Sequence, residues 1–302
     1  MKVLVIGATG FIGLPAAQAL VRAGHIVYGL VRSEDKAKML AAEETPSVIN
    51  EAVIPIYGDA DSEAWVPLIA SLDVIIEAMG GGANLPVVSP ALFHRVVKAA
   101  TELRPSGAPL LSYIYTSGTW VHGDDRVNVV TDTRPPEIMK WRPAVEQLVV
   151  QSAEVNGIAV RPALLYGRSA SLFTPLFEGA KAGKVSWPGT PGGRYALIHA
   201  DDLAEMYVKV AEKASLVGGK IFDVSSPNTE SVDDFLGRLV AVAGAKAPYE
   251  YRRPENLYEE ALQSTTLLRP YLAEALLGWS PRKPGLVEGL ETYYAAWVAG
   301  RS

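Results

Sequence analysis

The sequence predicts an α/β fold on a parallel sheet, followed by a smaller, loop-rich region. Apolar runs of strand length alternate with helical patterns over the first 160 residues, as in successive βαβ units. A glycine turn, residues 7–13, directly follows the first apolar run. From Arg161 onward, prolines and glycines cluster, most densely at residues 188–193. We therefore expect a first domain over residues 1–160 and a second over 161–302, some segments of which return to the sheet.

Composition excludes several classes of function. The 302 residues are 49% hydrophobic and 20% charged, as in ordinary globular proteins. A net charge of −5 without a basic block argues against nucleic-acid partners. With no cysteine and only four histidines, none spaced as metal ligands, we expect no disulfide, thiolate nucleophile or metal site. The chain opens in a strand and has no bilayer-length apolar stretch, which favours a cytoplasmic protein without signal peptide or membrane contact. We expect a monomer or a homodimer.

The opening segment carries the strongest functional signal. Residues 1–6 read as a strand, and apolar residues at helical spacing follow the glycine turn until Gly24. In this context Gly7 permits a sharp turn, Gly10 lets the backbone approach a pyrophosphate, and Gly13 lets the helix pack closely on the strand. The helix N-terminus offers N–H groups and the positive end of its dipole. We conclude that the segment binds a dinucleotide; the alternative is a β–α turn without a ligand.

The remaining elements of the first domain follow from apolar periodicity and from turn residues. Ser33 is placed to cap the second helix, and Pro143 favours a helix start at that point. We expect helices over 36–42, 92–103 and 144–155, and strands over 26–31, 53–57, 73–78, 110–115 and 158–160.

Four ordered stretches, 7–13, 116–123, 161–167 and 197–204, resemble the extended short-chain dehydrogenase/reductases, the epimerase/dehydratase group. Residues 277–290 also look like this group, so the resemblance covers nearly the whole chain. It implies a Rossmann-type, doubly wound parallel sheet with a smaller C-terminal substrate lobe. Together with the glycine turn, it implies a cofactor-binding set of Gly7, Thr9, Gly10, Phe11, Ile12, Gly13, Arg32, Asp59, Ala78, Met79, Gly80, Thr116, Ser117, Arg142, Pro162, Leu164 and Leu165.

The resemblance fails at the catalytic triad. Such enzymes use a Ser or Thr, a Tyr and a Lys, with the Tyr and Lys four residues apart on one helix. The Lys depresses the pKa of the phenol, so that the Tyr exchanges a proton as hydride moves. Alignment on the flanking motifs puts Gly118, Ile138 and Arg142 at these three positions. Arg142 retains donors for ribose hydroxyls, but no phenol is left for it to activate.

Other side chains are weaker candidates for proton transfer. Ser117 and Thr119 flank Gly118, although hydroxyls at strand ends more often satisfy local backbone groups. Tyr166 and Tyr195 are the best remaining tyrosine candidates for proton transfer in the second domain. For His122 we expect a packing role, for Asp201 a helix cap, and for Trp120, Trp141 and Trp187 either a pocket lining or plain core.

Arg32 bears on the choice of cofactor. It ends the second strand, where a protein that prefers NAD carries an acidic residue for the ribose 2′-hydroxyl. A cation suits a 2′-phosphate, so we expect NADP(H) to be preferred, with NAD(H) possible; the alternative is a solvated arginine. Asp59 resembles the acid that contacts adenine in the group, and a turn aspartate is the alternative.

These observations favour an NADP(H)-binding oxidoreductase that reduces a small carbonyl or imine substrate by hydride transfer without the usual Tyr–Lys pair. The cofactor carries the hydride chemistry, so loss of a general acid slows the reaction without forbidding it. Two alternatives stay open. One is a non-catalytic dinucleotide-binding sensor or regulatory protein, and the other is a redox-neutral isomerase or cyclase.

Overall fold

The computed structural model describes residues 1–41, 52–80, 84–168, 172–245 and 248–300, which form two interleaved compact units. The first unit comprises residues 1–117, 144–160 and 203–222. The second comprises residues 118–143, 161–202 and 223–302. Ala42, the expected end of a helix, and Gly81 and Gly82 lie outside the described residues. A division of roles at residue 160 between cofactor and substrate binding stays a prediction.

A seven-stranded sheet organises the first unit and confirms the expected Rossmann-type α/β class. Its order is β3-β2-β1-β4-β5-β7-β12, and its strands pair in parallel from β3 to β7. The order reverses between β1 and β4, which is where ligands of open parallel sheets bind. The strands are β1 (Lys2–Ile6), β2 (Ile26–Val31), β3 (Ile54–Tyr57), β4 (Val74–Glu77), β5 (Ser112–Thr116), β7 (Asn156–Pro162) and β12 (Ile221–Val224).

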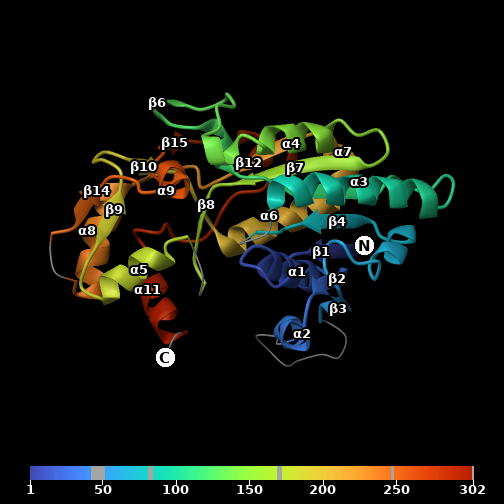
Figure 1. The fold of residues 1–302 in the computed structure, drawn as a ribbon, viewed down its shortest axis with the longest axis horizontal. Coiled ribbons are helices and arrows are strands. Elements are labelled where there is room, and N and C mark those ends of the chain that lie inside the picture. Colours follow the sequence, from blue (N-terminus) through green and yellow to red (C-terminus); the bar gives the residue numbers. More distant parts are fainter. Residues whose placement is uncertain (42–51, 81–83, 169–171, 246–247, 301–302) are drawn as a thin grey trace. The chain divides into compact units, whose positions relative to one another are not determined.

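Helices lie on both faces of this sheet, as in a doubly wound fold. In Figure 1, α1 and α6 lie on one side of the sheet, and α3 and α4 lie on the other. Because both faces are covered, the central strands are continuous apolar runs: Val3, Leu4 and Val5 are fully buried. The helices are α1 (Gly13–Arg22), α2 (Glu34–Ala41), the 3₁₀ turn η1 (Val66–Ala70), α3 (Leu85–Leu103), α4 (Arg142–Val150), α6 (Ala200–Glu212) and α7 (Ala214–Val217).

Several element boundaries differ from those expected. Helix α3 begins at Leu85, seven residues before the expected start at residue 92, and includes Pro90. Pro86 lies in the first turn, where backbone N–H groups have no partner within the helix, so the helix tolerates it. Helix α4 ends at Val150 rather than 155, because strand β7 already begins at Asn156. Ser33 caps α2 as expected, since its Oγ accepts from the Lys36 N–H at 3.4 Å.

The second unit contains short strands in two-stranded sheets. β8 pairs with β11, β9 with β14 and β6 with β15, all in parallel, while β10 and β13 are antiparallel. The strands are β6 (Asp125–Val129), β8 (Leu164–Tyr166), β9 (Ser186–Pro188), β10 (Arg194–Tyr195), β11 (Leu197–His199), β13 (Glu230–Ser231), β14 (Glu250–Arg252) and β15 (Thr266–Leu267). The helices and 3₁₀ turns are η2 (Thr119–His122), η3 (Glu137–Met139), α5 (Thr174–Lys181), α8 (Val232–Ala243), α9 (Leu257–Leu262), α10 (Tyr271–Leu277) and α11 (Leu290–Ala299).

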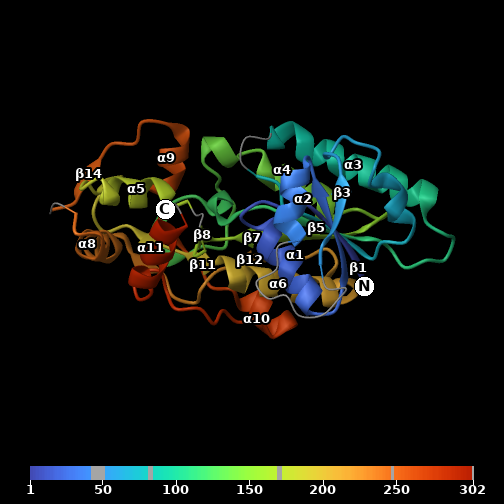
Figure 2. The ribbon, with the colours of Figure 1, turned by 90° about the horizontal axis from the view of Figure 1, so that it is seen from below.

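An aromatic core holds the second unit together. Helices α5, α8 and α11 pack together in Figure 2. The Phe173 ring lies 5.1 Å from that of Phe235 and 6.4 Å from that of Trp187, between ring centroids. The Phe177 ring packs edge-on against Trp297, with 5.6 Å between the ring centroids. Trp187 is thus core, one of the two roles foreseen for it. No helix within the described ranges is long and apolar enough to cross a membrane.

Candidate functional site

The glycine turn fits against the end of β4 because it carries no side chains. Gly7 has φ +88°, and a Cβ added there would lie 2.5 Å from the Ala78 carbonyl oxygen. A Cβ on Gly13 would lie 2.1 Å from the Gly7 carbonyl oxygen, so only glycine lets α1 start so close to β1. Both separations are far below van der Waals contact. The sequence predicted a sharp turn at Gly7 and close packing of the helix at Gly13. At both positions the structure has a close backbone approach that only glycine allows.

Gly10 is different, because a side chain there would be crowded by only one backbone atom. It is exposed, and a Cβ there would meet the Gly7 oxygen at 3.2 Å and little else. Its N–H donates to that oxygen at 2.9 Å, which closes the turn before α1. The turn and the Ala78–Met79–Gly80 segment follow β1 and β4, the two strands at the reversal of the sheet. A dinucleotide pyrophosphate fits such a cradle, with the α1 N-terminus as its anion-binding end.

Glu77, which the sequence analysis treated only as part of a strand, fixes the base of this segment. Its carboxylate is buried and accepts hydrogen bonds from the Ser89 hydroxyl (2.5 Å) and the Tyr113 hydroxyl (2.6 Å). Burial and the nearby Glu77 charge raise the pKa of Tyr113 well above its usual value, so this phenol stays protonated. The sequence signal that could have identified Glu77 is its place as a glutamate in an otherwise apolar strand.

Arg32 and Asp59 follow β2 and β3 on the same unit. Arg32 is exposed, and no other described residue makes a hydrogen bond or ion pair with its guanidinium. Asp59 serves a turn: its Oδ1 accepts from the Asp61 N–H at 3.1 Å, and its carbonyl accepts from Trp65 Nε1 at 3.2 Å. This is the turn arrangement weighed above; contact with adenine stays a prediction.

The end of β5 carries two buried hydroxyls. Ser117 donates to the carboxylate of Glu146 on α4, which is fully buried. Thr116 shares a hydrogen bond of 2.6 Å with the Tyr207 hydroxyl. The Ser117 proton is therefore held by a carboxylate in this unit.

The remaining residues of the predicted cofactor set belong to the second unit. Pro162, Leu164 and Leu165 are buried at the end of β7 and in β8. Arg142 is the first residue of α4, and its guanidinium lies over the Trp141 ring, 4.6 Å from the centroid. Ile138, which aligns with the usual tyrosine, lies in η3 and not on α4. Positions 138 and 142 thus do not share one helix, the arrangement that the usual Tyr–Lys pair requires.

The two spare phenols donate to backbone carbonyls. Tyr166 donates to Pro284 O at 2.8 Å, and Tyr195 donates to Leu262 O at 2.9 Å. Both side chains are buried, and burial raises the pKa of each well above the usual value for tyrosine. These hydrogen bonds connect segments of the backbone and do not point to catalysis. A catalytic role for Tyr166 therefore stays a prediction.

His122 is buried, as expected of a packing residue, but it also joins a polar cluster. One ring nitrogen pairs with Asp132 O at 2.6 Å and the other with Asp223 Oδ1 at 2.9 Å. The Arg161 guanidinium lies 3.9 Å from the same carboxylate oxygen. Burial alone would lower the pKa of His122, yet the Asp223 hydrogen bond and charge raise it above its usual value near 6.5, against the effect of Arg161.

The expectation that Asp201 caps α6 is wrong. The capping side chain is His199, whose Nδ1 accepts from the Asp201 N–H at 3.1 Å. The Asp201 carboxylate instead pairs with Arg168 Nε at 2.7 Å and Lys283 Nζ at 3.2 Å. The acidic residue lies in the first turn of α6, where ion pairs to the loops compete with a capping bond. Burial lowers the pKa of His199, so its ring is neutral near pH 7.

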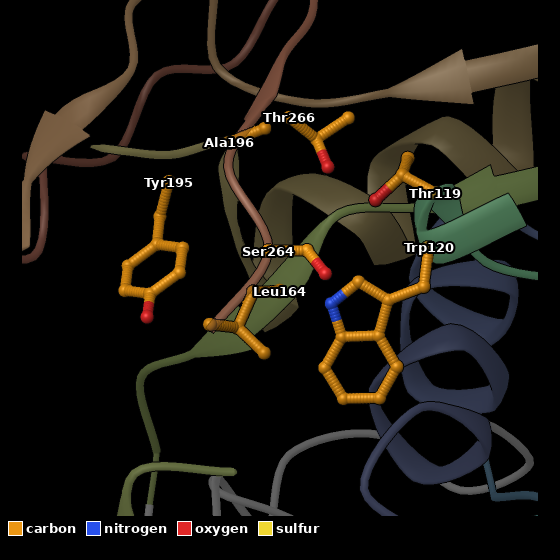
Figure 3. Close-up of a pocket in the computed structure, with 7 residues that line it drawn as sticks. All are labelled: Thr119, Trp120, Leu164, Tyr195, Ala196, Ser264 and Thr266. Atoms are coloured by element: carbon orange, nitrogen blue, oxygen red, sulfur yellow. The ribbon is translucent and has the colours of Figure 1, made fainter. Parts of the chain in front are cut away.

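A small pocket opens within the second unit (Figure 3). It has room for about one water molecule. Hydroxyls and aromatic rings line it, and Thr119, a predicted catalytic candidate, is among them. The seven lining residues are Thr119, Trp120, Leu164, Tyr195, Ala196, Ser264 and Thr266. Within the described ranges, no group of three or more His, Asp or Glu side chains is arranged to hold a metal ion.

The fold and the glycine cradle define a protein that binds a nicotinamide dinucleotide. The chain belongs to the NAD(P)H-binding family, whose profile matches residues 7–213.

Three relatives share about a quarter of their residues with this chain. A 3-diazoavenalumate denitrifying reductase of a Streptomyces species is 25% identical over 96% of this chain and 99% of its own. The 4-hydroxy-2-methyl-3-oxo-4-farnesyl-3,4-dihydroquinoline-1-oxide ketoreductase of Stigmatella aurantiaca is 26% identical over 82% and 75%. The chloroplast stem-loop binding protein of 41 kDa b of Arabidopsis thaliana is 26% identical over 97% and 78%.

Comparison with solved structures confirms that this chain has the fold of the epimerase/dehydratase group. A UDP-glucuronic acid 4-epimerase from Bacillus cereus, in complex with UDP-glucuronic acid and NAD, superposes with a TM-score of 0.78. It is 18% identical and covers 99% of each chain. The resemblance inferred from four motifs is therefore confirmed at the level of the fold, while the absence of the triad stays a prediction from the alignment.

We predict that Gly10→Val abolishes dinucleotide binding but leaves the protein folded. The branched side chain would fill the open space beside the turn, where a pyrophosphate would lie. Gly13→Val is the contrasting variant: its Cβ would strike backbone at 2.1 Å, so we expect it to destabilise the fold itself. Calorimetric titration with NADPH and thermal unfolding of both variants separate the two effects. Native affinity in Gly10→Val would contradict our reading of the turn.

We predict that Asp223→Asn lowers the pKa of His122. Because the folded pKa is raised, the stabilisation is fully present below the unfolded pKa, near 6.5, and is lost as the pH rises through the folded value. The stability difference between the parent and Asp223→Asn should therefore be largest in acid and shrink as the pH rises. NMR titration of the imidazole and urea unfolding at several pH values measure this.

Asp132→Asn is the matched control for this prediction. Only the backbone carbonyl of Asp132 contacts His122, and its exposed carboxylate pairs with Arg134 at 2.8 Å. This variant should leave the His122 titration nearly unchanged. A stability difference for Asp223→Asn that does not vary with pH would show that Asp223 does not set the charge of His122.

Proposed function

We propose that this protein is an NADP(H)-dependent reductase of a small carbonyl or imine substrate. The observation that carries the proposal is the glycine cradle at the reversal of the sheet, which has the backbone shape that a dinucleotide pyrophosphate requires. Reductase activity, rather than binding alone, is supported by the names of two relatives that match most of the chain.

The residues present fit a nicotinamide dinucleotide in the first unit. The cradle leaves no room for a Cβ at Gly7 or Gly13, and Gly10 is exposed, so backbone N–H groups can approach the pyrophosphate. Arg32 would bind a 2′-phosphate through a charge-assisted contact. When bound in reduced form, the cofactor supplies a hydride to the electrophilic carbon of the substrate.

A proton must then reach the oxygen or nitrogen of the reduced group. In the expected alignment no tyrosine is available for this, and the Ser117 proton is already held by Glu146. Thr119 is the better hydroxyl, because it lines a pocket and makes no hydrogen bond to another described residue. Its high intrinsic pKa suits orientation of a substrate oxygen and relay of a proton from water more than acid catalysis. We infer that the site favours substrates that are already polarised, such as iminium ions or conjugated ketones.

A non-catalytic role is the second candidate, and one comparison favours it. A relative that is similar over 97% of this chain is named as a stem-loop binding protein, so a protein of related sequence is named for binding and not for a reaction. The net charge of −5 weighs against such a partner here. A redox-neutral isomerase or cyclase is supported only by the fold of sugar-nucleotide epimerases.

The test is turnover of NADPH with a panel of ketones, enones and cyclic imines, each with the parent and with Gly10→Val. Reductase function requires loss of NADPH absorbance that depends on both substrate and an intact cradle. Tight NADPH binding without turnover of any compound would overturn the reductase proposal and leave the non-catalytic role. An isomer of the substrate, formed without net NADPH consumption, would instead identify an isomerase.

We predict that the protein binds NADPH at least about tenfold more tightly than NADH, which corresponds to about 1.4 kcal/mol. Arg32→Ala should remove most of this preference and leave NADH binding unchanged. Arg22→Ala is the control, since this exposed arginine lies at the far end of α1 from the glycine turn. Calorimetric titration of both cofactors checks the prediction, and equal affinities in the parent protein would refute it.

A further inference from the structure

The pocket that contains Thr119 also offers polar groups to which the proposed reaction assigns no role. In Figure 3 the hydroxyls of Thr119, Ser264 and Thr266 face a common space, and the indole nitrogen of Trp120 lies on the same side. We call this space the hydroxyl recess. Leu164, Tyr195 and Ala196 complete its lining. Of its seven described lining residues, none carries a charge.

The donors and acceptors of the hydroxyl recess can be assigned individually. The Thr266 hydroxyl donates to Gly123 O at 3.1 Å, and the Ser264 hydroxyl donates to Glu260 O at 3.4 Å. Each hydroxyl has a single proton, so both side chains present lone pairs as acceptors. Thr119 and the Trp120 indole make no hydrogen bond to other described residues, so both are available as donors.

Size and polarity limit what enters. The hydroxyl recess has room for about one water molecule, which corresponds to a single oxygen atom with its proton. A group that both donates and accepts satisfies Thr266 and Thr119 together, whereas a carbonyl oxygen only accepts. A diphosphate is too large, and burying its charge without a cation is costly. The Trp120 ring, held edge-on to Tyr258 at 5.8 Å between centroids, offers an apolar surface beside the opening.

We propose that the hydroxyl recess binds the alcohol or phenol hydroxyl of a small, uncharged substrate or product, with the apolar body of that ligand against Trp120. The assignment of this ligand to the reaction rests on the proposed reductase function, whereas the hydroxyl recess itself is defined by its own residues. It differs from the ligands of the fold neighbours: UDP-glucuronic acid carries a diphosphate, for which the hydroxyl recess has no cation.

The experiment is calorimetric titration of the full chain, without cofactor, with 1-phenylethanol, acetophenone and UDP-glucose. The alcohol accepts from Thr119 and donates to Thr266, while the ketone only accepts. We expect the alcohol to bind roughly fivefold more tightly than the ketone, as for one hydrogen bond, and UDP-glucose not to bind at the hydroxyl recess. Competition between UDP-glucose and the alcohol distinguishes binding there from binding elsewhere.

Three variants locate the effect. Thr266→Val should weaken binding of the alcohol alone and reduce its advantage, because Ser264 remains as a second acceptor. Thr266→Ser should retain that advantage, and Thr119→Val should weaken binding of alcohol and ketone alike by roughly fivefold or more. Thr101→Val is the matched control, because Thr101 also donates to a backbone carbonyl, Val97 O at 3.0 Å, in the first unit. Thermal unfolding shows whether each variant is folded.

Two results would overturn the proposal: an alcohol-to-ketone ratio that Thr266→Val leaves unchanged, or displacement of the alcohol by UDP-glucose. Absence of measurable binding of either small compound to the folded parent would also overturn it. Because no cofactor is present, these outcomes are separate from the turnover test. Binding without NADPH turnover would leave the hydroxyl recess in place and remove only its link to reduction.

Discussion

The contact between the Gly7 backbone and the Ala78 carbonyl sets the geometry on which the rest of the first unit depends. The backbone of Gly7 and that of Ala78 meet directly, in the space that a side chain on residue 7 would need. The same contact brings together the ends of β1 and β4, the strands at which the order of the sheet reverses. A second close approach, of Gly13 to Gly7, starts α1 immediately above β1. The N-terminal end of α1 is thereby placed beside both loops, which is the geometry that anion binding at a helix end requires.

Buried carboxylates join separate elements within each unit. Glu77 accepts from two hydroxyls in the first unit, and Glu146 accepts from Ser117 in the same unit. In the second unit Asp202 accepts from the backbone N–H groups of Arg282 and Lys283 at 2.9 and 3.1 Å. A buried carboxylate is stable only when such donors satisfy it, so each fixes the elements that supply them. Elements of each unit are thus joined by directional bonds in addition to packing.

Local patterns predicted the first unit well, because its strands are continuous apolar runs and its turn has a fixed backbone requirement. The start of α3 was missed by seven residues, and the missed stretch includes Pro86, which the first turn of a helix tolerates. The polar cluster of His122, Asp223 and Arg161 joins residues up to 101 positions apart, and such a distance leaves no periodic signal. Asp201 was expected to cap α6, but its ion-pair partners lie in distant segments that a local pattern does not show. Thr119 was named from an alignment, yet its neighbours Ser264 and Thr266 come from a stretch without a motif.

The interleaving of the two units has a consequence for synthesis and folding. The chain leaves the first unit after residue 117, returns for residues 144–160 and returns again for residues 203–222. The last strand of the seven-stranded sheet, β12, begins only at Ile221. On the ribosome the first unit therefore cannot complete its sheet before Val224 has been made, and by then residues 118–143 and 161–202 of the second unit have already been made. The two units therefore cannot fold one after the other during synthesis. Until β12 has been made, the sheet of a partially synthesised chain has an open edge at β7.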